Sequence, residues 1–110
     1  MFMNISKADA IAHLAKWYDA GTEIRITHTT VTGNLIVVGQ ISKSNDSAIT
    51  ITGKDCELLL YFRATSEYRY DDSRALPTEA NKRRMNKYPT IISIKFATGD
   101  RTEISEFFRE

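Results

Sequence analysis

The sequence predicts a mainly β protein in which an N-terminal helix covers a small, strongly bent antiparallel barrel of five or six strands. Ile, Thr and Val, whose β-branched side chains suit a pleated sheet, account for 27 of the 110 residues. Apolar residues are spaced as in a helix before Gly21 and alternate after it. The chief alternative is an open α+β sandwich, because residues 66–89 are longer than a barrel connection needs.

The helix is predicted over Lys7–Ala20. Ser6 fits the N-cap, and Asp9 three residues later places a carboxylate near the unpaired amides of the first turn. Gly21 supplies the left-handed residue that ends a helix. The apolar residues expected to face the sheet are Ile11, Leu14, Ala15 and Tyr18, with Trp17 beside them.

The strands are predicted from alternating apolar and polar residues between turn residues. The first four form a β-meander over residues 23–65, as Glu23–Thr29, Leu35–Ser42, Ala48–Thr52 and Cys56–Thr65. Residues 66–89, with both prolines and a short helix expected over Thr78–Lys87, form an irregular basic excursion. A closing hairpin over residues 90–108 pairs Ile91–Phe96 with Thr102–Phe107, so the whole chain is read as a single domain.

Composition restricts the compartment and the partners. A net charge of +1 gives no whole-molecule argument for nucleic acid or an anionic membrane as partner. Cys56 is the single cysteine, so an internal disulfide is excluded. No signal peptide is read at the start, and no apolar run approaches the ~18 residues of a membrane span. We expect a cytoplasmic protein without a membrane partner.

Residues 38–51 carry Gly39 two positions before an apolar residue, then a polar turn and an alternating strand. This pattern resembles the first signature of Sm-like proteins, particularly their bacterial RNA-chaperone branch. With the preceding helix and strand, the resemblance covers residues 6–62. It implies a barrel of the Sm-like or SH3-like kind, in which Gly39 allows a sharp bend, together with RNA binding and rings formed by edge-strand pairing.

The chain departs from the Sm-like pattern in three places. Asn45 stands where the family's turn usually carries an acid. Ile49 stands where eukaryotic members have a base-contacting Asn. The second signature is absent from residues 91–104.

No reactive constellation is predicted, so we expect no enzyme activity, no metal site and no cofactor. His13 falls opposite the apolar stripe and is expected in solvent, whereas His28 shares a strand face with isoleucines and is expected half-buried with a partner. Cys56 starts an apolar strand and is expected to be buried. Asp71 and Asp72 are expected to open a loop.

Charge is unevenly distributed along the chain. Residues 63–88 hold seven basic and four acidic residues interleaved with tyrosines, which suits a solvated loop, a protein contact, or phosphate contact with base stacking. The candidate contacts with a protein or nucleic acid are Arg69, Tyr70, Lys82, Arg83, Arg84, Lys87 and Tyr88.

The function predicted from these observations is a non-enzymatic binding or assembly module that acts through protein–protein contact. The alternative is an Sm-like RNA-binding protein that uses residues 63–88. We also predict a homo-oligomer, because the edges of a short sheet need cover. The adjacent rings of Phe107 and Phe108 are the candidate interface, since at least one of them must point away from the core.

Overall fold

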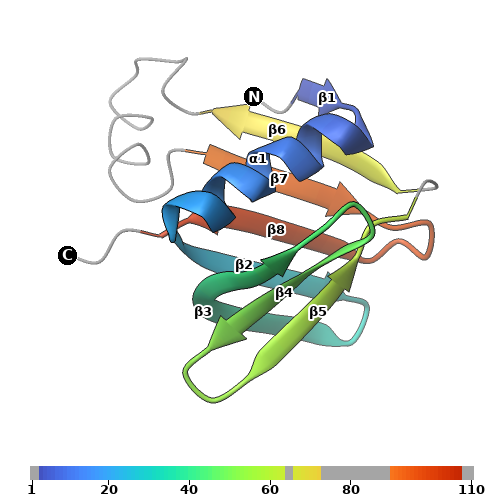
Figure 1. The fold of residues 1–110 in the computed structure, drawn as a ribbon. Helices are drawn as coiled ribbons and strands as arrows, with labels where there is room; N and C mark the ends of the chain where they lie inside the picture. The colour runs from blue at the N-terminus through green and yellow to red at the C-terminus, as the bar shows by residue number, and fades with distance from the viewer. Residues whose placement is uncertain (1–2, 64–65, 73–89, 108–110) are drawn as a thin grey trace, which may run out of the picture.

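The computed structural model describes residues 3–63, 66–72 and 90–107, which form one helix and eight strands (Figure 1). In chain order the elements are β1 (Met3–Ile5), α1 (Lys7–Ala20), β2 (Glu23–Thr30), β3 (Gly33–Ser44), β4 (Ala48–Gly53), β5 (Glu57–Tyr61), β6 (Glu67–Asp72), β7 (Thr90–Lys95) and β8 (Arg101–Glu106). The predicted class, mainly β with one helix near the N-terminus, is therefore confirmed. That helix is neither long nor apolar enough to cross a membrane.

All eight strands belong to one antiparallel sheet with the order β1-β6-β7-β8-β2-β3-β4-β5. The sheet curves strongly and does not close, and α1 lies across the face around which it curves (Figure 1). The prediction of a barrel with five or six strands is wrong, because β1 and β6 join the six expected strands and the resulting eight-stranded sheet is not closed among the described residues. In this respect the structure follows the open-sheet alternative.

The two strands that sequence reasoning missed pair with each other. Tyr68 and Tyr70 of β6 lie opposite Ile5 and Met3 of β1, and β7 pairs along the other side of β6. Residues 67–72 are therefore not irregular, and Asp71 is buried within β6 instead of opening a loop. The expected helix over residues 78–87 lies outside the described residues.

The bounds and both ends of α1 are as predicted. Ser6 Oγ accepts a hydrogen bond from the amide of Asp9 at 3.0 Å, and Gly21 adopts a left-handed φ of 64°. The buried stripe is rotated from the expected one: it is centred on Ala10, Leu14 and Trp17, while Tyr18 is 40% exposed.

The core lies between α1 and the concave face of the sheet. Its central residues are isoleucines on neighbouring strands that are completely or almost completely buried: Ile24, Ile26, Ile49, Ile51, Ile92, Ile94 and Ile104. Each of these side chains contributes roughly 1.5–3 kcal/mol of burial free energy. The alternation read from the sequence therefore places the core on the correct face.

Gly39 lies where β3 begins to pair with β4. It sits directly opposite Gly53, and a Cβ on Gly39 would overlap the carbonyl oxygen of Thr52. A register shift follows between Ile41 and Lys43, which is how a β-bulge bends and twists a strand. Close approach of two backbones, not a left-handed conformation, is what requires glycine here.

Candidate functional site

The two predicted contact residues on β6 lie on opposite faces of the sheet, because neighbouring residues of a strand alternate. Arg69 is exposed, and its guanidinium lies 3.9 Å from the carboxylate of Glu67. Tyr70 is half-buried and packs against the core. A single flat ligand therefore cannot contact both side chains. The remaining candidate contacts lie outside the described residues: Lys82, Arg83, Arg84, Lys87 and Tyr88.

The ring of Tyr70 stacks on His13 of α1, with 4.5 Å between the centroids and 18° between the planes. The expectation that His13 is in solvent is thus wrong. Both rings serve the contact between α1 and β6, and this contact removes Tyr70 from the set of side chains that could meet a partner freely.

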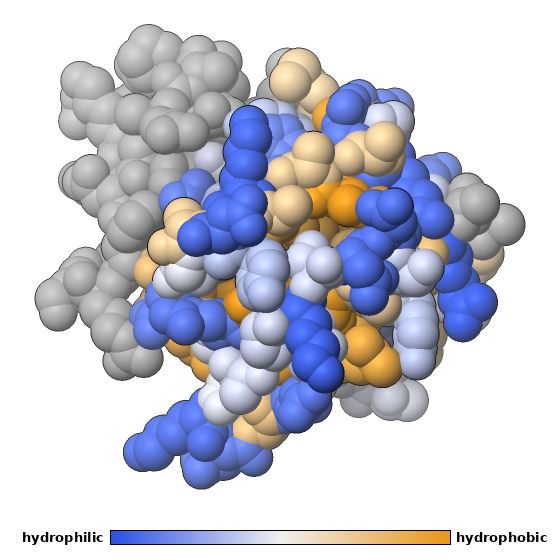
Figure 2. All heavy atoms as spheres, viewed as in Figure 1, coloured by the Kyte–Doolittle hydropathy of each residue, from blue (hydrophilic) through white to orange (hydrophobic). Residues whose placement is uncertain are grey.

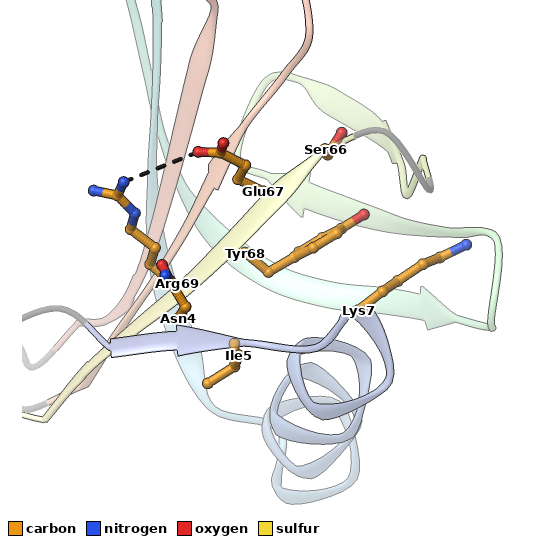
Figure 3. A pocket seen from close by; sticks show the side chains of 7 residues that line it. All are labelled: Asn4, Ile5, Lys7, Ser66, Glu67, Tyr68 and Arg69. Carbon is orange, nitrogen blue, oxygen red and sulfur yellow. Dashed lines mark ion pairs between the residues drawn. The ribbon is translucent and has the colours of Figure 1, made fainter.

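A polar hollow of about 320 Å³ lies beside the junction of β1 and α1 (Figure 3). Its lining residues are Asn4, Ile5, Lys7, Ser66, Glu67, Tyr68 and Arg69. Lys7 and Tyr68 extend in one direction, whereas Arg69 and Glu67 meet on the other side of β6 (Figure 3). An exposed ion pair of this length adds little stability, and nothing converges on a single ligand position.

Tyr68 connects this hollow to the chain that leaves β5. Its side chain is buried, and its hydroxyl donates a hydrogen bond to the carbonyl oxygen of Arg63 at 2.9 Å. Burial raises the pKa of the Tyr68 hydroxyl above its ordinary value of 10.0. At neutral pH the group is therefore a protonated hydrogen-bond donor with a structural role.

A second hollow, of about 280 Å³, lies around His28 and Phe96 at the end of β2 and β7. His28 Nδ1 lies 2.7 Å from Thr102 Oγ1, and its ring meets Phe96 edge-on at 6.2 Å. The prediction of a half-buried, hydrogen-bonded His28 is confirmed. Among the described residues, no group of three or more His, Cys, Asp or Glu side chains is arranged to hold a metal ion.

The strand β5, at one edge of the sheet, carries exposed apolar side chains. Leu59 and Tyr61 are 50% and 53% exposed, and Glu57 is also exposed. Cys56, just before the strand, is exposed too, so the expectation that it is buried is wrong. Leu58 and Leu60 alternate with these residues and face the core.

Other large apolar side chains are exposed outside β5: Met3 in β1, Tyr18 in α1, Val31 in the turn between β2 and β3, and Leu35 and Ile36 in β3. Figure 2 shows hydrophobic surface between α1 and the β3–β5 strands, with hydrophilic side chains around it. In β5 the exposed residues alternate along the terminal strand of the sheet, whereas Leu35 and Ile36 lie on the part of β3 that precedes its pairing with β4 at Gly39. The edge that β5 forms, with its residues Glu57–Tyr61, is called the β5 edge below.

The predicted oligomer contact at the C-terminus is described only in part. Phe107 is half-buried, and its amide donates to the carbonyl oxygen of Glu23 at 2.9 Å. Phe108 lies outside the described residues.

Comparison with known proteins identifies no relative: no protein-family model matches the chain, and neither the curated proteins nor the solved structures give a match.

Sequence reasoning placed the candidate contacts in residues 63–88 and at Phe107 and Phe108, and did not consider the β5 edge. The alternation of residues in β5 can be recognised in the sequence. The position of β5 at the edge cannot, because β5 is left at the edge only when β6 pairs with β1 and β7 at the other end of the sheet.

Proposed function

We propose that this protein is a non-enzymatic binding and assembly module that acts through protein–protein contact and takes its partner at the β5 edge. The observation that carries this proposal is that Leu59 and Tyr61, both half-exposed, lie on the terminal strand of an open sheet. Proteins normally protect such an edge with proline, charged side chains (lysine above all), a bulge or a very short strand. The β5 edge has neither proline nor lysine, and Glu57 is the one charged residue in the strand.

A partner strand added to this edge would form backbone hydrogen bonds with β5, and its side chains would contact those of β5. Tyrosine suits such a contact, because it supplies a large rigid surface together with a polar hydroxyl. Tyr61 is therefore the first anchor residue in this proposal.

Site-specific photo-crosslinking in the native cells tests the proposal. A photoreactive phenylalanine analogue replaces Tyr61 in one variant and Ile36 in a matched variant, since the two side chains are 53% and 54% exposed. We expect a discrete protein adduct from position 61 and none from position 36. Equal labelling at both positions, or no adduct at position 61, would contradict the proposal.

RNA binding is the competing function, and the same variant tests it. Phosphate contacts make the affinity for RNA fall steeply with salt. We would test short uridine-rich or adenine-rich RNA. If this RNA binds with an affinity that falls with salt, and if it suppresses the adduct at position 61, RNA binding is the better-supported function and protein contact is rejected.

A further inference from the structure

We infer that the β5 edge pairs with the β5 edge of a second copy of this chain, antiparallel about a two-fold axis that passes beside Leu59. This inference rests on the proposed function and names the partner for the same site. An isologous contact of this kind uses one surface patch twice, so the patch must be complementary to itself. The backbone, the side chains and the charges of the β5 edge each meet that condition.

The backbone directions follow from the bonds at both ends of β5. Gly53 donates to the carbonyl oxygen of Cys56, and the amide of Phe62 donates to the carbonyl oxygen of Ser47, both at 2.8 Å. In an antiparallel pair, the residues that bond to the neighbouring strand alternate with those that point away from it. The residues that direct their N–H and C=O groups away from β4 are therefore Glu57, Leu59 and Tyr61.

These outward groups fix the register of the pairing. A two-fold axis beside Leu59 places Leu59 opposite Leu59 of the second copy, and Glu57 opposite Tyr61 of the second copy. All three outward residues of each copy then pair, whereas a register shifted by two residues leaves one of them unpaired. No like charges face each other within β5 in this arrangement.

Side chains on this edge are complementary in the same register. Leu59 meets its own symmetry mate, and Tyr61 lies diagonal to it, within reach of an aromatic ring. The pairing thus covers the two half-exposed apolar side chains of the strand in both copies.

The charges that flank β5 continue the complementarity. Asp55 lies four residues before Leu59, and Arg63 lies four residues after it; both are exposed. The same two-fold axis brings Asp55 of each copy toward Arg63 of the other. Opposite charges at both ends favour the antiparallel register.

Two substitutions at one position test this register by analytical ultracentrifugation. Tyr61→Lys places a cation opposite Glu57 of the second copy, and Tyr61→Glu places a second anion there. Both variants lose the Tyr61 ring, so both should dimerise more weakly than the wild type. Each charge contact occurs twice in the dimer, so we expect the dissociation constant of Tyr61→Glu to exceed that of Tyr61→Lys about tenfold. Equal dissociation constants for the two variants would overturn the register.

A second pair of variants separates backbone pairing from loss of apolar surface. Proline is tolerated on an edge strand where its missing N–H would face solvent, so Leu59→Pro should stay folded and lose the dimer. Leu59→Thr keeps the N–H and should keep the dimer with weaker affinity. Phe107→Ser should leave the dimer unchanged, and a dimer lost only in Phe107→Ser would move the interface to the C-terminus.

The crosslink at position 61 distinguishes failure of the dimer from failure of the proposed function. An adduct at twice the chain mass of 12.5 kDa supports self-pairing. If wild-type protein stays monomeric at about 200 µM while position 61 labels a different protein, self-pairing is wrong and the proposed function holds. If it stays monomeric and labels nothing, both are wrong.

Discussion

At one edge of the sheet, β1 has three residues and leads directly into the N-cap of α1, whereas at the other edge β5 has five residues and no described strand beyond it. Ile5 of β1 is half-buried against the core, while Leu59 of β5 is half-exposed. A very short edge strand leaves few unpaired backbone groups, which limits association. The β5 edge lacks this protection.

This contrast indicates that the two edges have different roles. β1 completes the fold, because it covers β6 and positions the start of α1. β5 completes the fold with its inward leucines and, in our proposal, binds a partner with its outward residues. Substitutions at the two edges should therefore separate folding from association.

The largest effect is expected where the β4–β5 hairpin meets β3. In Gly39→Ala the new Cβ would overlap the carbonyl oxygen of Thr52 and approach the Cα of Gly53 to 2.9 Å. Neither backbone atom can move alone, so we expect a loss of about 2–3 kcal/mol in the free energy of unfolding, measured with urea.

The facing glycine provides the control for Gly39→Ala. A Cβ on Gly53 meets its nearest atom, the carbonyl oxygen of Val38, at 3.1 Å. Gly53→Ala should cost less than about 1 kcal/mol. Equal losses of unfolding free energy in the two variants would show that the close backbone approach at Gly39 is not what makes the pairing of β3 with β4 sensitive to substitution.

Alanine substitutions at the two edges test the comparison directly. Ile5→Ala removes half-buried apolar surface and should cost about 1–2 kcal/mol of unfolding free energy. Leu59→Ala should cost less than about 0.5 kcal/mol in dilute protein, because its side chain contributes little to the monomer core. Urea unfolding at low concentration and sedimentation at high concentration separate the two effects.

The division of roles between the edges would be wrong if Leu59→Ala destabilised the monomer as much as Ile5→Ala does. It would also be wrong if Ile5→Ala dissociated the proposed dimer without a loss of stability.

A smaller effect is expected at the cap that joins β1 to α1. Ser6→Ala removes the acceptor for the amide of Asp9 and should lower the unfolding free energy by about 1 kcal/mol. Ser6→Asp keeps an acceptor and should restore most of this stability. If neither variant changes the unfolding midpoint, the cap does not contribute to holding the β1 edge.

How much of this could be predicted from the sequence depends on how local each feature is. The bounds of α1 follow from Ser6 and Gly21, and the β2–β3 and β7–β8 hairpins follow from local alternation. The strand β6 could also have been predicted, since Tyr68 and Tyr70 alternate with charged residues. The excess of basic residues favoured the interpretation of this segment as a loop. The three residues of β1 are too few to show a period.

The candidate site could not be predicted for a different reason. Whether Leu59 lies at an edge or in the middle of the sheet depends on which strands pair. The next strand in the chain, β6, does not pair with β5 but lies between β1 and β7. On α1, likewise, His13 stacks on Tyr70, a residue 57 positions away in the sequence. Such pairings are set by the packing of the whole sheet.

The smallest predicted effect concerns Tyr68, which links the two edges: it pairs with Ile5 of β1, and its hydroxyl donates to the carbonyl oxygen of Arg63, two residues after β5. Burial raises the pKa of Tyr68, so above its ordinary value of 10.0 the unfolded chain loses this proton before the folded chain does. The stability that this shift contributes is present below pH 10 and is lost as the pH rises through the folded pKa. Tyr68→Phe should therefore lose less stability between pH 9 and pH 11 than the wild type, as measured by urea unfolding. Parallel pH curves for the two proteins would show that folding does not raise the pKa of the Tyr68 hydroxyl.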